Sequence, residues 1–308
     1  MKPEVVGIMN LLVDDYVQAE AFRELLKSFI ADKAEEQSIW SDITLLAHYM
    51  LGGDGQDIDR RSALTEIIVL ALDIADDLQD EDNEAKPWMR CPRELALNAL
   101  LAFNAMASAE LGRLQASGTE AGRVVSEVSR MVMRAVNGQY KDLSGAVLTE
   151  EDYEAAVREK SGSLVRLACY LGYAGLPVQE SAETQLNDLA DCIGMVAQIE
   201  NDVKDVQRYD LKNDLLQRKR TLPVLFLLEE PAEEFPFIHR YYAGEMTKEQ
   251  FLLHKQDCLA YIRDSGCLEY SRVIQSLYAD KAEQLLGAIS AVSPWKERFA
   301  GLTLGFAK

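Results

Sequence analysis

The sequence predicts an all-α fold, a single domain over residues 1–308 built as a bundle of long helices. Almost every long segment repeats apolar residues at three- and four-residue spacing, as the buried face of a helix does. No segment shows the sustained alternation of apolar and polar residues that is typical of strands. No stretch rich in Pro, Gly or Ser divides the chain. Hydrophobic residues make up 48% of the chain and charged residues 27%, which are ordinary values for a globular protein, so we expect one large core.

The breaks between the apolar repeats carry residues that start and stop helices. The run GGDG at 52–55 predicts a turn, and Pro87 and Pro92 bracket a loop. Thr149, followed by three acidic residues, predicts a capped helix start, and Gly175 ends that helix. The expected helices are 3–32, 36–49, 58–80, 93–116, 120–142, 150–173 and 182–209, with a less regular C-terminal third after them.

The charge balance excludes some classes of partner. A net charge of -19 argues against broad binding to nucleic acid or anionic lipid, because both require clustered Lys and Arg. An anionic ligand would therefore have to be held locally, by metal ions and a few placed cations.

The cysteines and the N-terminus indicate a compartment. Five cysteines form no CxxC pair and their number is odd, so we expect neither a disulfide framework nor a zinc site, and a reducing cytoplasm fits. The N-terminus lacks the basic flank and uninterrupted apolar core of a signal peptide. We also expect no membrane span.

A first acidic cluster lies at 70–83, LALDIADDLQDEDN, where six acidic residues fall among apolar residues of helical period. On a helix, Asp73 and Asp77 share one line of the surface, and Asp76 and Asp80 share the next. Like charges so placed repel by roughly a few tenths of a kcal/mol per pair, and more where they are partly buried. Bound Mg²⁺ would compensate this repulsion, and the alternative is a solvated acidic helix face.

A second cluster at 198–205, QIENDVKD, repeats this design. Asn201 and Asp205 are four residues apart, and Asp202 lies between them. If the two clusters face each other across a cavity, they can hold several Mg²⁺ ions around a diphosphate and neutralise the charge that develops as it leaves.

Such a site needs cations for the diphosphate oxygens that the metals leave free. Lys160 opens the run KSGSL, where a glycine would let a ligand approach closely. Lys212 and Lys219 follow the second cluster, and Arg90 and Arg93 follow the first. Alternatively, each of these residues is an ordinary solvated cation on the surface.

Several other residues leave two interpretations open. Gln139, in an NGQ run that interrupts a helix, and Gln198 would steer a substrate or a metal-bound water, or would be satisfied buried amides. Trp40, Trp88 and Trp295 are expected to be packing residues rather than rings that stabilise a cation.

Five motifs together resemble those of the trans-isoprenyl diphosphate synthases, or polyprenyl synthetases. DDLQD at 76–80 is similar to the first aspartate-rich motif of that family and NDVKD at 201–205 to the second, with Asn in place of its first Asp. NGQ at 137–139, KSGSL at 160–164 and DLLQRKRTLP at 214–223 also match, in the family's order. The resemblance covers roughly residues 47–228.

The resemblance implies an isoprenoid synthase type I fold, in which long helices surround a deep apolar cavity with the two motifs on opposite walls near its mouth. It also implies a homodimer and Mg²⁺, about three ions per active site. The metal ligands carried over are Asp76, Asp80, Asn201 and Asp205. The residues expected to be catalytic are Asp76, Asp77, Asp80, Lys160, Asn201, Asp202 and Asp205. For diphosphate binding, the resemblance implies Lys160 and Lys219, and we add as candidates the residues considered above, Lys212, Gln139, Gln198, Arg90 and Arg93.

Two departures bear on the acceptor. Chain-elongating members carry GGKR upstream of the first motif and RRG after it, and those cations bind isopentenyl diphosphate. Here GGDG at 52–55 has neither Lys nor Arg, and EDNEAKPWMRCPR follows Asp80, so the cations that would bind an acceptor diphosphate are missing. A branch of the family, the ComQ-like prenyltransferases, is similar in HYMLGGDG at 48–55, in PWM at 87–89 and in REKSGSL at 158–164. That resemblance implies transfer of a geranyl or farnesyl group (C10 to C15) from an allylic diphosphate to a tryptophan of a short pheromone-precursor peptide in quorum sensing.

Three alternatives remain at the level of sequence. A polyprenyl diphosphate synthase would use Arg60, Arg61, Arg90 or Arg93 in place of the missing cations. A non-catalytic partner subunit of a prenyl synthase would be expected to lose one aspartate cluster, and both are present. Terpene cyclisation would need no acceptor.

Overall fold

The computed structural model describes residues 1–36, 38–55, 57–81, 83–116, 123–208 and 214–305. These residues form α-helices and no strand, which confirms the predicted all-α class. The helices are α1 Pro3–Tyr16, α2 Glu20–Glu35, α3 Trp40–Met50, α4 Ile58–Asp80, α5 Pro87–Arg90, α6 Arg93–Ala116, α7 Val124–Leu143, α8 Glu150–Glu159, α9 Ser161–Tyr173, α10 Glu180–Gln207, α11 Leu222–Glu229, α12 Pro236–Tyr242, α13 Lys248–Leu252, α14 Lys255–Asp264, α15 Cys267–Ala288 and α16 Trp295–Leu304.

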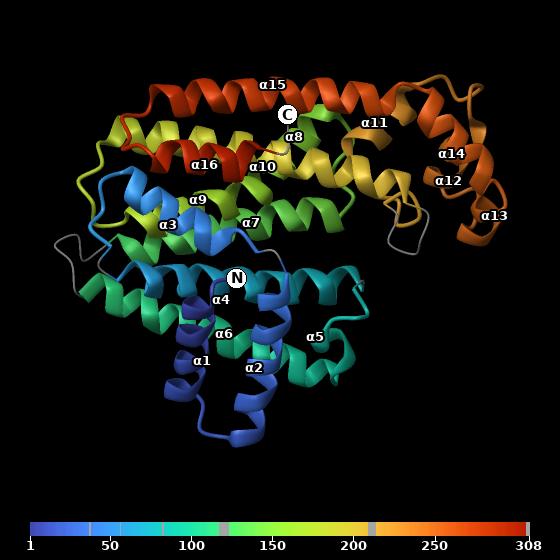
Figure 1. The fold of residues 1–308 in the computed structure, drawn as a ribbon. Coiled ribbons are helices and arrows are strands. Elements are labelled where there is room, and N and C mark those ends of the chain that lie inside the picture. Colours follow the sequence, from blue (N-terminus) through green and yellow to red (C-terminus); the bar gives the residue numbers. More distant parts are fainter. Residues whose placement is uncertain (37, 56, 82, 117–122, 209–213, 306–308) are drawn as a thin grey trace.

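The long helices run side by side, as Figure 1 shows. Helix α10 packs most extensively against α15 and α9, and α3 packs against α9 and α4. The α1–α2 hairpin extends from the α4–α6 side, and α12, α13 and α14 form a small lobe beyond the end of α10 (Figure 1). In this arrangement α4 forms one wall of the bundle interior, and α7 to α10 form the facing wall.

Two expected helices are each divided in the structure. The expected helix 3–32 is α1 and α2, because Val17 and Ala19 take extended dihedrals and the chain reverses between them. No Gly or Pro marks this turn, since the buried faces of both helices contribute to one core and set the hairpin. The expected helix 150–173 is divided at Lys160 into α8 and α9.

The C-terminal third is more regular than the sequence indicated. Helix α15 has 22 residues, but its buried positions include Cys267, Ser271 and Gln275. Short and polar side chains at four-residue spacing leave only a weak apolar periodicity, and this explains why the helix was not predicted.

Helix α6 corrects the expectation that no stretch approaches a membrane span. In the described part of the chain, Arg93–Leu114 is long and apolar enough to cross a membrane by length and composition alone, and 39% of its apolar 18-residue stretch is buried. A core helix passes the same test. Ala96, Ala99, Phe103 and Met106 of this helix belong to the main core.

Candidate active site

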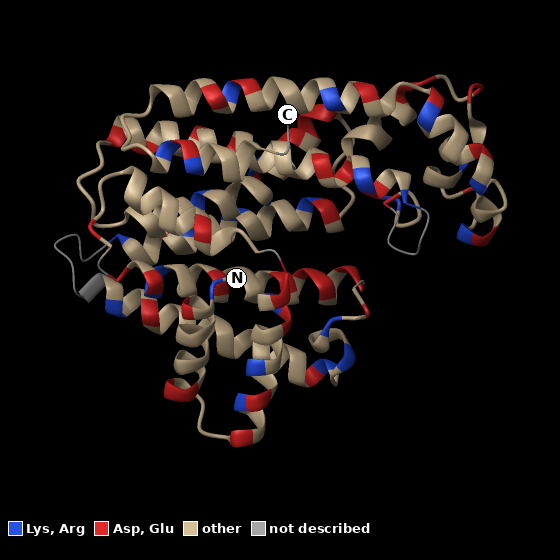
Figure 2. Cartoon of the chain, viewed as in Figure 1, with Lys and Arg blue, Asp and Glu red and all other residues tan. Residues whose placement is uncertain are grey.

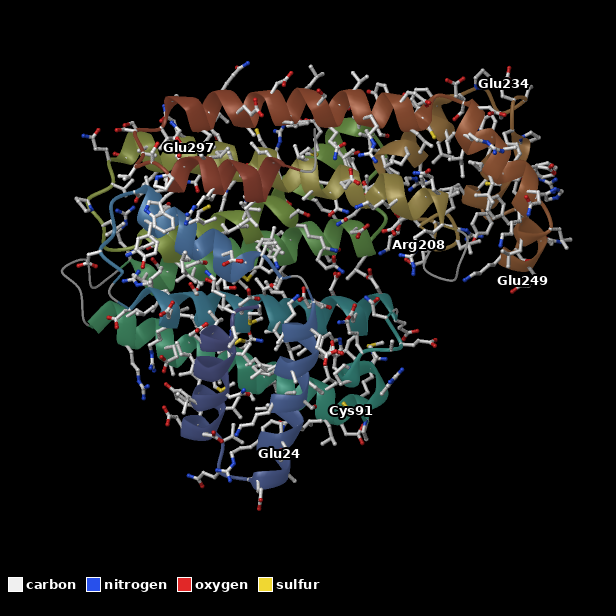
Figure 3. The ribbon with its side chains drawn as sticks, viewed as in Figure 1. Glu24, Cys91, Arg208, Glu234, Glu249 and Glu297 are labelled. Atoms are coloured by element: carbon white, nitrogen blue, oxygen red, sulfur yellow. The ribbon has the colours of Figure 1, made fainter. Side chains whose placement is uncertain are left out.

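The two acidic clusters line one cavity of about 480 Å³. Asp76 and Asp80 reach it from the last turns of α4, and Asn201, Asp202 and Asp205 reach it from the last turns of α10. Acidic residues mark the ends of α4, α7 and α10 at one end of the bundle in Figure 2. Figure 3 labels Arg208, which follows α10, and Cys91, which follows α5, on the two sides of this end.

Three charged residues that the sequence reasoning missed line the same cavity. They are Asp142 at the end of α7, and Asp214 and Arg220 on the segment between α10 and α11. Asp142 lies three residues after Gln139, so the i, i+3 spacing on one helix face could have identified it. No helical pattern places the other two. Lys212, predicted to bind diphosphate, lies outside the described residues.

Two lysines bridge the cavity to the first cluster. Lys160 Nζ lies 3.0 Å from Oδ1 of Asp76 and 3.8 Å from Oδ2 of Asp142. Lys219 Nζ lies 2.6 Å from Oδ2 of Asp80. Burial opposes the charge on the Lys219 ammonium, but the Asp80 carboxylate outweighs it and holds the pKa of Lys219 above its ordinary value. Of the three lysines predicted to bind diphosphate, Lys160 and Lys219 are therefore inside the site and paired with its carboxylates.

The break between α8 and α9 directs Lys160 into the cavity. Lys160 has ψ of -79°, and its amide still donates to the Ala156 carbonyl at 2.8 Å. Helix α7 crosses at this point through Gly138, where a Cβ would lie 2.5 Å from the Lys160 nitrogen. A larger residue at position 138 would displace the kink, so the NGQ run serves the placement of Lys160.

Gly162 of the KSGSL run has a different role from the one we expected. A Cβ on Gly162 would lie 2.6 Å from Oδ1 of Asp191, on α10, rather than beside a ligand. Asp191 accepts hydrogen bonds from Arg134 at 3.1 Å and from Arg166 at 2.8 Å. The glycine thus allows α9 to approach an ion-pair cluster that ties α7, α9 and α10 together.

Asp202 is held by neighbours on both sides. The hydroxyl of Tyr153 donates to Oδ2 at 2.6 Å, and the Gln198 amide donates to Oδ1 at 2.8 Å. Gln198 in turn accepts from Ser161 at 2.9 Å. Burial raises the pKa of Asp202 to about 6, although these hydrogen bonds act to lower it. Burial and the charge of Asp202 raise the pKa of Asp214 to about 8. Gln198 and Tyr153 therefore orient the second cluster.

Asp77 differs from its neighbours in the first cluster, because it is buried and does not line the cavity. The Trp88 indole donates to Oδ2 of Asp77 at 2.7 Å, and the Asn83 amide donates to Oδ1 at 2.5 Å. Asp77 thereby fixes the loop that follows α4. Its contacts indicate a positioning role in place of the catalytic role that the resemblance implied.

Arg90 and Arg93 also lie outside the cavity lining. Arg90 donates to the Glu84 carbonyl at 3.3 Å, and Arg93 donates to the Leu78 carbonyl at 3.3 Å. Arg93 also contacts Glu81 at 3.4 Å, and its side chain is 64% exposed. These contacts hold the loop after α4, so the structure does not bring these two predicted cations to the diphosphate position.

The GGDG run lies far from the clusters. It precedes the N-terminal end of α4, whereas residues 76–80 form its C-terminal end, about 30 Å away along a helix of 23 residues. His48 Nδ1 lies 2.8 Å from the Gly172 carbonyl, and Gly55 N–H donates to His48 Nε2 at 3.0 Å. This run therefore joins the α3–α4 turn to the end of α9. Residues 52–55 are therefore not part of the lining of the cavity that the clusters share.

Arg60 and Arg61, the other cations considered for an acceptor diphosphate, are also engaged at that far end. Arg60 donates to Glu110 at 2.7 Å. Arg61 donates to the carbonyls of Ala174 at 2.7 Å and Leu171 at 3.2 Å, and so caps the end of α9.

The oxygen-rich lining suits a hard cation such as Mg²⁺. No group of three His, Cys, Asp or Glu in the described residues forms a ready-made metal site. Mg²⁺, however, commonly uses one or two carboxylates and completes its shell with water and substrate phosphate oxygens. Gln139 donates to Asp80 at 3.4 Å, and its own carbonyl oxygen is buried without a partner, as an acceptor for a metal-bound water would be. The residues that would hold the metals are Asp76, Asp80, Asn201 and Asp205.

The helical bundle and its carboxylate-lined cavity define an enzyme of the isoprenoid synthase class, a prenyltransferase. The model of the polyprenyl synthetase family matches residues 39–255, and the chain belongs to that family.

The chain is similar to relatives over nearly its whole length. It is 28% identical over 308 residues to the tryptophan prenyltransferase ComQ of Bacillus subtilis (strain 168), covering 97% of this chain and 98% of that protein. A polyprenyl synthetase of Streptomyces coelicolor superposes with a TM-score of 0.81 at 19% identity, over 99% and 96% of the two chains. A polyprenyl synthase of Caulobacter crescentus, solved in complex with calcium and isoprenyl diphosphate, superposes with a TM-score of 0.79 at 21% identity, over 99% and 94%.

Proposed function

We propose that this prenyltransferase is Mg²⁺-dependent and transfers a C10 to C15 prenyl group from an allylic diphosphate to a tryptophan of a short peptide. The observation that carries the proposal is the distribution of cations. Among the described residues, Lys160, Lys219 and Arg220 are the cations that line the cavity, and none of the three comes from α4. They suffice for one diphosphate. The similarity to a tryptophan prenyltransferase supports an acceptor that carries none.

The reaction needs the leaving group held and water kept out. Lys160, Lys219 and Arg220 would bind the diphosphate oxygens. Mg²⁺, when bound by the two acidic clusters, supplies charge to neutralise the leaving diphosphate. The bond between C1 of the prenyl group and the diphosphate oxygen breaks, and its electron pair goes to the diphosphate. The indole ring then donates an electron pair to form the new bond to C1 and loses one proton, which the diphosphate or solvent takes up.

The prenyl chain would lie against the apolar part of the lining. This part comes from the segment before α8 and from α8, α9 and α10, and it excludes water from the reacting carbon. Its residues are Val147, Ala156, Val157, Leu164, Val165 and Ala197.

A homodimer and a single domain complete the proposal. Adjacent helices α6 and α7 expose Leu97, Leu101, Met133 and Val136, each 45% or more accessible, and a second copy would cover such a face. One apolar core includes residues from Val5 to Leu304, which supports one domain. The five cysteines, all within the described residues, form no disulfide bond, as we would expect in a reducing cytoplasm.

Polyprenyl diphosphate synthesis is the second candidate. The second motif is well represented in the cavity by Asn201 and Asp205, as chain elongation would also require. The contacts of Arg60, Arg61 and Arg93 weigh against it, because these cations are engaged elsewhere.

The test supplies both acceptors to the purified protein. Farnesyl diphosphate and Mg²⁺ are incubated with either a peptide of about ten residues that contains one tryptophan, or isopentenyl diphosphate. We expect farnesylated peptide by mass spectrometry, no product when the tryptophan is replaced by phenylalanine, and none with EDTA. Steady formation of longer diphosphates with an unmodified peptide would refute the proposal.

A further inference from the structure

Trp40 packs partly against the main core, but unlike Trp88 and Trp295 it also lines the cavity. Trp88 is buried in the core, and Trp295 stacks on Tyr49 with ring centroids 4.6 Å apart, so both fit the expectation of packing residues. Trp40, the first residue of α3, is half-buried and lines the cavity together with Asp76 of α4. Its ring therefore borders the space in which the reaction occurs.

A buried carboxylate fixes the backbone on both sides of Trp40. Glu66 of α4 is fully buried, and it accepts hydrogen bonds from the Ser38 hydroxyl at 2.7 Å and from the Ser41 amide at 2.8 Å. Burying a carboxylate is costly unless hydrogen bonds compensate it. Here these bonds go to residues that flank Trp40, so Glu66 holds the first turn of α3 against α4.

The cations nearest this wall are already paired. Lys33 at the end of α2 contacts Asp73 at 2.7 Å and Glu36 at 2.8 Å. Lys86 contacts Asp32 at 2.7 Å and also Glu36. These three carboxylates outnumber the two lysines. A second diphosphate on the α2–α4 side would meet excess negative charge, whereas an uncharged aromatic group would not.

We propose that Trp40 is the platform on which the aromatic ring of the acceptor lies, and that Glu66 positions it. The inference rests on the proposed function, because it assigns the acceptor side of the same cavity. Two stacked or edge-on rings attract each other beyond the area that they bury, and this gives an aromatic acceptor an advantage that an aliphatic one lacks. The cations for the leaving group come from the α8–α9 break and from the segment before α11, whereas Trp40 comes from α3, so the two substrates would contact different parts of the lining.

The test separates acceptor binding from ionisation of the donor. Peptide transfer is measured for the wild type, Trp40→Ala and Trp40→Phe, and Mg²⁺-dependent release of diphosphate from farnesyl diphosphate is measured without peptide. We expect Trp40→Ala to raise the KM for the peptide about tenfold, which corresponds to about 1.4 kcal/mol. Diphosphate release should change less than about twofold, and Trp40→Phe should restore most of the KM.

The control and the contradicting outcomes are distinct. Trp295→Ala removes a ring outside the cavity and should leave the peptide KM unchanged. A fall in diphosphate release in Trp40→Ala would mean that the ring stabilises the allylic cation, and it would overturn the proposal. If the wild type transfers the prenyl group and Trp40→Ala has the same peptide KM, the role of Trp40 is overturned but the proposed function stands. If the wild type transfers no prenyl group to the peptide, the proposed function is overturned, and this inference with it.

Glu66 is tested as a positioning residue. Glu66→Gln keeps the shape of the side chain and weakens its hold on Ser38 and Ser41. We expect a raised peptide KM with unchanged acceptor-free diphosphate release in the folded variant, verified by its circular dichroism spectrum. A parallel loss of both activities would indicate a general structural role and would contradict the assignment.

Discussion

Lys219 and Asp80 are joined across the mouth of the cavity by an ion pair of 2.6 Å, although they are far apart in the sequence and approach from different walls. Lys160 and Asp76 form a second such pair at 3.0 Å. Each lysine that would bind the diphosphate thus neutralises a carboxylate that would bind a metal. The charges of the site are partly satisfied before either ligand arrives.

These pairs predict that Mg²⁺ and diphosphate bind cooperatively. Mg²⁺ alone must separate a lysine from its carboxylate and leave that lysine without a partner. Diphosphate alone must separate the same pair and leave the carboxylate without a partner. When both ligands bind, the metal neutralises the carboxylate and the diphosphate neutralises the lysine. We expect inorganic pyrophosphate to tighten Mg²⁺ binding about tenfold to a hundredfold in isothermal titration calorimetry. Additive binding of the two ligands would contradict this.

Lys219→Met tests the same relationship from the protein's side. It leaves the Asp80 carboxylate available, so we expect Mg²⁺ alone to bind more tightly than in the wild type and pyrophosphate about tenfold more weakly. Lys204→Met is the matched control, because Lys204 is 63% exposed and pairs with Glu200 on the surface of α10. Equal effects of the two substitutions would show that the cross-cavity pair is unimportant.

Asp76→Ala should separate catalysis from stability. It removes a carboxylate from the cavity, and we expect kcat/KM to fall about a hundredfold or more, roughly 3 kcal/mol of transition-state stabilisation. The free energy of unfolding should change by less than about 1 kcal/mol, because the Lys160 pair is partly exposed and repulsion within α4 is relieved. Asp59→Ala, at the exposed opposite end of α4, should keep full activity. Unchanged turnover in Asp76→Ala would make the cluster an ordinary acidic surface.

Asp77→Ala should give the reverse result. The substitution leaves the indole N–H of buried Trp88 without its partner and frees Asn83, so we expect a loss of roughly 2–4 kcal/mol of stability in urea unfolding. Affinity of the folded variant for Mg²⁺ with pyrophosphate should fall less than in Asp76→Ala. A stable Asp77→Ala variant that cannot bind metal would identify Asp77 as a ligand instead.

The local spacing explains why the clusters were predictable. Helix α4 has the bounds expected from its apolar period, and the four-residue spacing of Asp76 and Asp80 requires them to share a face. The same holds for Asn201 and Asp205 on α10. Spacing could not predict that Asp77 faces Trp88. Adjacent residues on a helix point about 100° apart, and the packing of the helix decides which of these directions faces the cavity.

Tertiary contacts explain what the sequence could not supply. The role of Gly138 depends on α7 meeting the α8–α9 break, which a single glycine in a helical sequence does not reveal. The resemblance of GGDG to GGKR carried no information on position, and the run lies at the end of α4 opposite to the first cluster. Asp214 and Arg220 enter the cavity from the segment between α10 and α11, whose approach no helical period encodes.

Asp214 predicts how stability depends on pH. Burial and the Asp202 carboxylate raise the pKa of Asp214 from its ordinary value to about 8, against the attraction of Lys219, so the folded protein binds this proton more tightly than the unfolded chain does. The stabilisation is complete below about pH 4 and is lost as the pH rises through about 8. Asp214→Asn removes this titration. Without metal, the wild type should lose stability as the pH rises from 5 to 9, and the variant should not lose this contribution. The free energy of unfolding of the variant, measured in urea, should therefore rise relative to that of the wild type by roughly 1–4 kcal/mol over this range. Asp188→Asn, at an exposed position of α10, should follow the wild type at both pH values. Parallel pH profiles for wild type and Asp214→Asn would mean that Asp214 ionises in the folded protein as it does in the unfolded chain.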